Sequence, residues 1–136
     1  ARARPVDAPL AVVAVGVNGM RARVRDFLPV VKTALGCEGL RFVDTGNPVR
    51  NVAVGGGACA SELMDAVRAG CDTFVTSDVK YNQFWDAKDL GLNLIDAGHF
   101  YTENPVTACL AEKIAAQFPD VEVKISETHR DCMKFY

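Results

Sequence analysis

The stretch NVAVGGGACASELMDAVRAGCDTFVTSDVKYNQFWDAKDLGLNLIDAGHFYTE (residues 51–103) alternates short apolar runs with longer amphipathic ones. Glycine or polar residues follow the short runs, which is typical of buried strands. The longer runs place apolar side chains at helical spacing and end at or near a glycine. Alternating strands and helices indicate a largely parallel sheet, because a helix supplies the crossover that a parallel pair needs. We therefore expect strands at 51–54, 73–76 and 92–95, and helices at about 60–69 and 80–89.

The flanking sequence extends this pattern on both sides. A short strand is expected at 40–43, and the turn-forming residues DTGNP after it suggest a hairpin-like connection to 51–54. The other expected elements are a strand at 10–15, a helix at 23–35, a helix at about 103–118 and a last strand at 121–125. The helix at 103–118 carries one apolar face, made of Val106, Cys109, Leu110, Ile114 and Phe118.

Length and composition predict one domain over residues 1–136, with a lead-in segment at 1–20. The order of strands and helices makes it an α/β domain with a largely parallel or mixed sheet flanked by helices. The chain is 49% hydrophobic and 24% charged, and its formal net charge is −2. Without a basic patch or an apolar stretch of roughly 20 residues, we expect a soluble protein with no nucleic-acid or membrane partner. The five cysteines are scattered and form no C-x-x-C pair, which favours free thiols in a reducing cytoplasm.

Three loops that follow strands carry the candidate site residues: GGGACAS (55–61), TSDVKY (76–81) and DAGHFYTE (96–103). All three should open on the edge of the sheet where ligands bind in such folds. Either the backbone N–H groups of Gly55, Gly56 and Gly57 bind an anion, or these glycines only allow tight packing. Asp78 is a candidate for the same ligand site, the alternative being a helix cap.

Two further side chains in these loops could carry chemistry. Cys59 is either a reactive thiol with a lowered pKa beside a helix start or a small buried residue. His99 and Glu103 stand four residues apart, within reach of one ion, and an imidazole with a carboxylate suits Zn²⁺, Mn²⁺ or Fe²⁺. The alternative is a hydrogen-bonded histidine and a glutamate that caps a helix. We expect His129 to be a surface or packing residue rather than a third ligand.

The glycine-rich turn, TSDVKY and above all DAGHFYTE resemble the second half of the Nif3-like family, also called dinuclear metal centre or GTP cyclohydrolase 1 type 2 proteins. The resemblance spans roughly residues 49–135 and is looser at 15–48. It implies an α/β fold of two similar halves, a hexameric homo-oligomer, and two divalent metal ions held between the halves. In this pattern His99 and Glu103 are metal ligands, and a His-His pair and an aspartate come from the N-terminal half.

Those N-terminal ligands are absent here, since the chain has two histidines that are not adjacent. We interpret the chain as the C-terminal portion of a longer protein; the alternative is a reduced relative that lost the site. Asn82 stands where many relatives have histidine, which leaves the substrate open.

The resemblance implies a metal-dependent hydrolase with a nucleotide or another phosphate-containing substrate, inactive as this chain alone. A non-catalytic metal-handling or scaffold module needs the same ligands. A nucleotide-binding domain is disfavoured, because no complete phosphate-binding motif is present.

Overall fold

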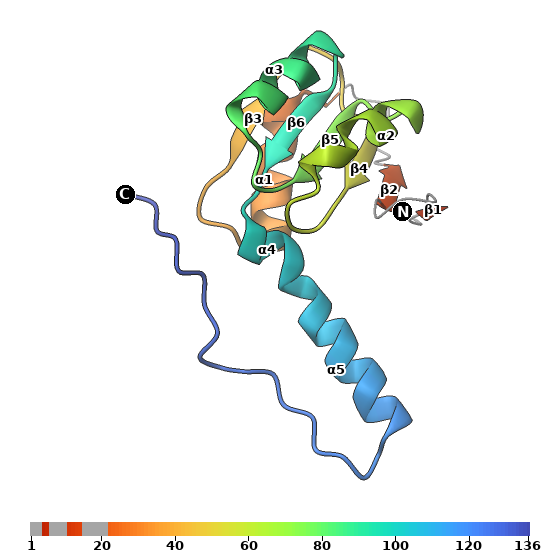
Figure 1. The fold of residues 1–136 in the computed structure, drawn as a ribbon, viewed down its shortest axis with the longest axis vertical. Coiled ribbons are helices and arrows are strands. Elements are labelled where there is room, and N and C mark those ends of the chain that lie inside the picture. Colours follow the sequence, from red (N-terminus) through yellow and green to blue (C-terminus); the bar gives the residue numbers. More distant parts are fainter. Residues whose placement is uncertain (1–3, 6–10, 15–21) are drawn as a thin grey trace.

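The computed structural model describes residues 4–5, 11–14 and 22–136, which form a six-stranded mixed sheet with helices on both faces (Figure 1). The strand order is β1-β2-β4-β5-β6-β3. The strands are β1 (Arg4–Pro5), β2 (Ala11–Ala14), β3 (Arg41–Val43), β4 (Asn51–Val54), β5 (Thr73–Thr76) and β6 (Asn93–Asp96). The helices are α1 (Val24–Leu35), the 3₁₀ turn η1 (Ala60–Glu62), α2 (Leu63–Arg68), α3 (Tyr81–Asp89), α4 (His99–Glu103) and α5 (Pro105–Gln117).

The centre of the sheet is parallel, as its sequence pattern predicts. Strand β4 pairs with β5 and β5 with β6 in parallel register, while β2 and β3 add antiparallel strands at either side. Every residue of β5 and of β6 is buried, because helices cover both faces. The central residues of each strand are apolar, Phe74 and Val75 in β5 and Leu94 and Ile95 in β6, while polar residues are buried at the strand ends. The predicted α/β fold with a mixed sheet is confirmed.

The alternation of side chains along the strands divides the core into two clusters. Val52, Val75 and Ile95 face α1 and form one cluster with Val24 and Val31 of that helix. The intervening strand residues Ala53, Phe74 and Leu94 face the other way and pack with residues of α2 and α3. Each strand therefore contributes to both layers, which fixes its register.

The expected hairpin between 40–43 and 51–54 is wrong. Strand β3 pairs antiparallel with β6, with Arg41 opposite Asp96. The intervening turn is bound to the start of β6, because the Thr45 N–H donates to Asn93 Oδ1 (3.0 Å) and Asn93 Nδ2 donates to the Asn47 carbonyl (3.0 Å). The turn thus leads the chain from β3 to β4, which β6 and β5 separate from β3 in the sheet.

The end of the chain also differs from the expectation. Residues 121–125 form no strand in the structure, because they follow α5 away from the sheet and no strand edge lies beside them to complete a ladder (Figure 1). The helix expected at 103–118 is present as α5, which begins at Pro105, a residue suited to a first helical position. An additional short helix, α4, begins at His99 within the stretch that was expected to be a loop. None of the helices in the described ranges is both long and apolar enough to cross a membrane.

Candidate metal site at the carboxyl edge of the sheet

The three loops singled out in the sequence meet at one edge of the sheet. The loop after β4 contacts the loop after β5 through the hydrogen bond from the Ser77 N–H to the Gly57 carbonyl (3.1 Å). It contacts α4 through the bond from the Gly57 N–H to Thr102 Oγ1 (2.9 Å). The parallel register of β4, β5 and β6 produces this convergence.

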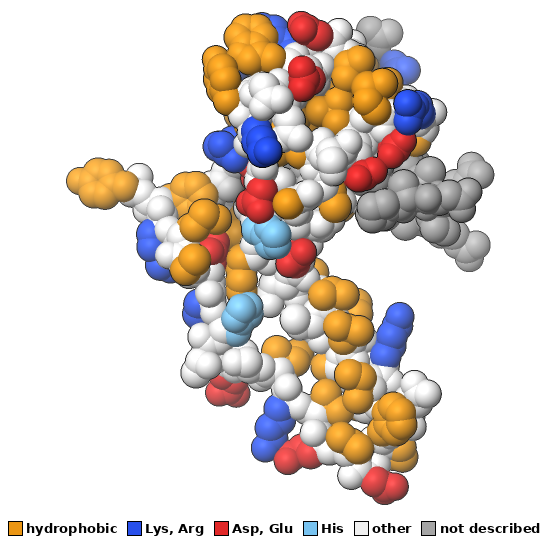
Figure 2. All heavy atoms as spheres, viewed as in Figure 1, with side chains coloured by type: hydrophobic (Ala, Val, Ile, Leu, Met, Phe, Trp, Pro, Cys, Tyr) orange, Lys and Arg blue, Asp and Glu red, His pale blue; other side chains and the backbone are white. Residues whose placement is uncertain are grey.

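Asp78, His99 and Glu103 form a line of hydrogen-bonded side chains at this edge. Asp78 Oδ2 lies 2.6 Å from His99 Nδ1, and Glu103 Oε2 lies 3.1 Å from His99 Nε2. His99 and Glu103 belong to one turn of α4, while Asp78 comes from the loop after β5. Figure 2 shows both histidines of the chain on one face, with acidic side chains beside the one nearer the sheet.

The backbone of Asp78 is in the left-handed region, with φ of 53°. This conformation is uncommon for residues other than glycine, although aspartate tolerates it better than most. The next residue holds the loop in place: the Val79 N–H donates to Asp96 Oδ2 (3.1 Å), and Arg41 Nη2 donates to the Val79 carbonyl (3.1 Å). The loop is therefore fixed with the Asp78 carboxylate against His99.

Asp96, the last residue of β6, links several parts of this edge through its carboxylate. It is 5% exposed, and its Oδ2 also forms an ion pair with Arg41. Its Oδ1 accepts the N–H of Gly98, the residue before α4 (3.0 Å). One buried carboxylate therefore joins the loop that carries Asp78 to the loop that carries His99. Sequence patterns identified neither Arg41 nor the joining role of Asp96, because the pair is 55 residues apart in the chain.

The hydrogen bond with Asp78 raises the pKa of His99 above its ordinary value; burial opposes the shift, and the charges of Asp78 and Glu103 reinforce it. When Nδ1 carries a proton and donates to Asp78, Nε2 is the nitrogen that faces Glu103. In a neutral imidazole this places a lone pair against a carboxylate oxygen, an arrangement that needs a proton or a cation between the two atoms.

The spacing of these two atoms suits a metal ion. Two ligands that bind one ion at about 2.1 Å each stand roughly 3.0–3.4 Å apart, for bond angles between about 90° and 109°. The distance from His99 Nε2 to Glu103 Oε2 falls in this range. Asp78 then has the position of the carboxylate that orients a metal-binding histidine from behind. Across the part of the chain that the structure describes, no group of three or more His, Cys, Asp or Glu side chains could hold an ion.

The glycine turn packs closely against α4. A Cβ atom at Gly56 would lie 3.0 Å from the Thr102 carbonyl oxygen, and one at Gly57 would collide with the Glu103 carboxylate. The Gly55 N–H donates to the Val75 carbonyl and that of Gly57 to Thr102. Gly56 is an exposed residue, and its N–H has no acceptor among the described residues. Anion binding by this turn stays a prediction, and of its three glycines Gly56 is the one with a backbone donor available for it.

A cavity of about 640 Å³ opens beside the site, between α4, α5 and the C-terminal segment. Asp78, His99 and Glu103 line one side of it and His129 lines another. The ring of His129 lies 5.1 Å from that of Phe100, so His129 packs against an aromatic side chain as expected.

All five cysteines are free, which confirms the prediction of unpaired thiols. The suggestion that Cys59 has a lowered pKa is wrong: burial raises its pKa, and the nearby carboxylates of Glu62 and Glu103 raise it further. A thiolate at this position would face two negative charges, which disfavours a nucleophilic role.

Comparison with known proteins agrees with the resemblance. The family model Duf34/NIF3 (NGG1p interacting factor 3) matches residues 10–132. A GTP cyclohydrolase 1 type 2 homolog from Clostridium perfringens is 30% identical over 133 residues, which cover 96% of this chain and 51% of that protein. The chain therefore spans about half the length of this relative.

Two solved structures share the fold. Staphylococcus aureus protein SA1388 matches with a TM-score of 0.78 at 26% identity, over 93% of this chain and 37% of that one. A Bacillus cereus protein related to NIF3 matches with a TM-score of 0.73 at 30% identity, over 93% of this chain and 35% of that one. With a family match over nearly its whole length, the chain belongs to the Duf34/NIF3 family.

Proposed function

We propose that this chain forms half of a divalent-metal site, with His99 and Glu103 as ligands to Zn²⁺, Mn²⁺ or Fe²⁺. The observation that carries the proposal is the line Asp78–His99–Glu103, in which a carboxylate fixes one ring nitrogen and aims the other at a second carboxylate. A neutral imidazole with its lone pair so directed is the form that binds metals.

Two protein ligands do not complete a site, so the remaining ligands belong to a segment that this chain does not contain. Two observations support this part of the proposal. The chain spans only 51% of the Clostridium relative. The apolar face of α5 begins three residues after Glu103 and is exposed, with Val106, Leu110, Ile114 and Phe118 each between 43% and 53% accessible. Figure 2 shows hydrophobic side chains gathered along the lower part of the molecule.

Helix α5 begins two residues after Glu103, the last residue of α4, so a partner that packs on the first turns of α5 lies next to His99 and Glu103. We propose that the other half of a NIF3-like fold occupies this place, supplies the missing ligands for two metal ions, and assembles with further copies into a homo-oligomer. Cytoplasmic location is part of the same proposal, since free thiols persist in a reducing compartment.

For the completed site we propose metal-dependent hydrolysis of a nucleotide or another phosphate-containing substrate. A divalent ion held by His99, Glu103 and the missing ligands would supply an activated water and would polarise the bond that is cut. In this chain, Asp78 keeps the proton of His99 on Nδ1, and the N–H of the exposed residue Gly56 is placed to donate to an anionic oxygen. The name of the Clostridium relative, GTP cyclohydrolase 1 type 2 homolog, supports a nucleotide as substrate class.

A non-catalytic metal-handling module is the second candidate. The side chains of His99 and Glu103 are 43% and 55% exposed, so an ion bound by them would be open to exchange with solvent. Incubation of nucleoside triphosphates with a longer protein that contains both halves separates the two candidates. Hydrolysis is followed as release of phosphate or as formation of a nucleotide with an opened base ring. Metal-dependent turnover supports the hydrolase; stoichiometric metal binding without turnover supports the module.

Calorimetric titration with Zn²⁺ and with Mn²⁺ tests the metal site itself. This chain alone should bind weakly, because two ligands and water stabilise the ion less than a full shell does. In the two-half protein, His99→Ala or Glu103→Ala should each weaken binding by about tenfold or more. The matched control is His129→Ala, which removes the other histidine and should leave the affinity within about twofold. Unchanged affinity in both ligand variants would show that DAGHFYTE is only a polar turn and helix cap.

A further inference from the structure

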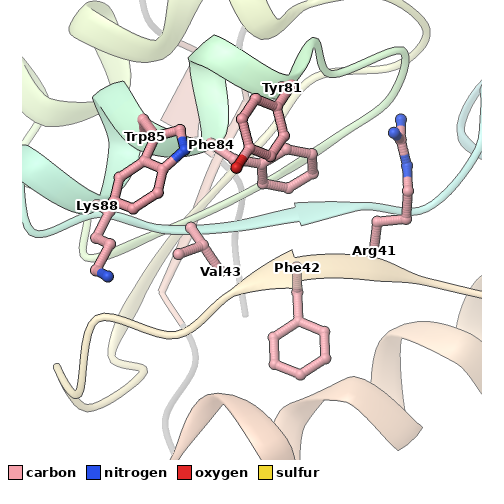
Figure 3. A pocket seen from close by; sticks show the side chains of 7 residues that line it. All are labelled: Arg41, Phe42, Val43, Tyr81, Phe84, Trp85 and Lys88. Carbon is pink, nitrogen blue, oxygen red and sulfur yellow. The ribbon is translucent and has the colours of Figure 1, made fainter.

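A second cavity lies between α3 and β3, apart from the candidate metal site (Figure 3). Its volume is about 320 Å³. The side chains of Tyr81, Phe84, Trp85 and Lys88 come from α3, and those of Arg41 and Val43 come from β3. The ring of Phe42 points away from the cavity toward α1, so β3 presents Val43 to it (Figure 3).

The aromatic side chains of this cavity are unusually accessible. Tyr81 is 76% exposed and Trp85 is 49% exposed, although burial of such rings is strongly favourable. The two rings stand edge to face, with centroids 6.5 Å apart, which leaves ring surface of each open. Exposed aromatic surface at the mouth of a cavity indicates that a ligand or partner covers it.

Two cations accompany the rings. Lys88 Nζ lies 4.9 Å from the centroid of Trp85, and the guanidinium of Arg41 lies 5.6 Å from that of Phe84. No carboxylate is among the lining side chains. Arg41 is held by Asp96 and by the Val79 carbonyl through Nη2, while its side chain remains 61% exposed. Within the described chain, Nε and Nη1 of Arg41 have no acceptor.

The cavity begins at the same edge of the sheet as the candidate metal site. Tyr81 is the first residue of α3 and follows Asp78 by three positions. Arg41 stands opposite Asp96 in the β3–β6 ladder, at the carboxyl end of β6. From this edge the cavity runs along α3 toward Lys88 (Figure 3).

We propose that this cavity binds an organic anion with a planar aromatic ring, the class to which nucleotides belong. The ring stacks on the open faces of Tyr81 and Trp85, and the anionic group pairs with Lys88 or with the outward N–H groups of Arg41. The volume is at the lower end of the range for small-molecule sites, which fits one or two fused rings. Apolar ring surface between two cations selects a ring and a negative charge together. This binding needs no metal ion, so it stands or fails separately from the proposed metal site.

Trp85 is the only tryptophan of the chain, so tryptophan fluorescence reports directly on this cavity. The probe is guanosine 5′-monophosphate, titrated into the chain in the presence of EDTA. The expected result is a saturable change in emission. Ribose 5-phosphate, which lacks the ring, and inorganic phosphate should each bind at least about tenfold more weakly, because base stacking supplies much of the affinity.

Two exposed positions provide variants that should fold. Tyr81→Ala and Lys88→Gln should each weaken the guanosine 5′-monophosphate affinity by about fivefold or more. Tyr136→Ala and Lys113→Gln remove the same kinds of side chain elsewhere on the surface and should leave it unchanged. Equal affinity for the nucleotide and for phosphate would overturn the proposal. So would a loss of nucleotide affinity in each control variant equal to that in the matching cavity variant. So would emission that changes with protein concentration but not with nucleotide, which would show that a second copy of the chain covers the rings.

Discussion

Asp78 shows how one residue sets the chemistry of its neighbour. Its left-handed backbone is fixed through Val79 by Asp96 and Arg41, and its carboxylate reaches His99 Nδ1. The sequence placed Asp78 in the site region, but it did not reveal the contact with His99, which is 21 residues away. A periodic pattern predicts which loops meet, whereas the direction of a side chain within a loop depends on the packing of residues from other elements.

The variant Asp78→Asn tests this contact, because asparagine tolerates the same backbone conformation and removes the charge. The pKa of His99 should fall in the variant, since the hydrogen bond with Asp78 is the main cause of its rise. The folded-state pKa of the wild type is raised, so the resulting stabilisation is present below the unfolded pKa of about 6.5 and is lost as pH rises through the folded value. The stability advantage of the wild type should therefore be larger at pH 5 than at pH 9.

NMR titration of the His99 ring, assigned by its absence from the spectrum of His99→Ala, measures the shift. Urea unfolding at both pH values measures the stability difference. Identical titration curves for the wild type and the variant would mean that the Asp78–His99 hydrogen bond does not form in solution.

At the scale of elements, the glycine turn after β4 and the helix α4 fit together as one unit. Gly57 has φ of 66°, and a Cβ atom there would meet the Glu103 carboxylate. The turn therefore requires glycine for its backbone conformation and also for the space that Glu103 occupies. The sequence pattern left open whether these glycines serve packing or ligand binding; the structure shows the packing contact.

Gly57→Ala should lower the free energy of unfolding by about 1–3 kcal/mol, the cost of a left-handed residue increased by the contact with Glu103. Gly46→Ala is the matched control, since Gly46 has φ of 84° and nothing lies within 4 Å of the added Cβ. It carries the backbone cost alone and should be the less destabilising of the two. Urea denaturation of both variants makes the comparison, and equal losses would mean that Glu103 moves away without cost.

At the scale of the whole molecule, α5 stands apart from the compact sheet domain (Figure 1). Its apolar face was predicted from periodicity, yet Leu110 is 49% and Phe118 51% exposed. A single helix of this length is marginally stable in water without a surface to pack on. The sequence predicted the face correctly and could not show what covers it, because a periodic pattern marks a buried stripe without naming its partner.

Leu110→Glu should therefore have different effects in two contexts. In this chain alone it should change the free energy of unfolding by no more than about 0.5 kcal/mol, as exposed substitutions do. In a protein that contains the other half it should cost about 2–5 kcal/mol, the loss typical of a buried leucine. Phe74→Ala, in the centre of the sheet, is the control and should cost about 3–5 kcal/mol in both. A large loss in the isolated, monomeric chain would show that α5 packs on the chain itself.

The same reasoning explains the remaining differences between sequence and structure. The units β4–α2–β5–α3–β6 were predicted because each depends on local periodicity. The pairing of β3 with β6 and the absence of a strand at 121–125 were not predicted, because strand pairing depends on which strand edges lie close together in space. For the same reason the Arg41–Asp96 pair had no signal in the sequence.

The placement of β3 on β6 has a consequence for the order of folding. The Arg41–Asp96 pair closes a loop of 55 residues, and the part of the closure entropy that depends on loop length costs about 3.5 kcal/mol. The β4–β5–β6 units need much shorter closures, so we expect them to form earlier. Until β3 docks, Asp96 lacks its arginine and the loop of Asp78 lacks one of its anchors. The geometry of the candidate metal site is thus completed late, and a nascent chain acquires it only after the sheet has its last strand.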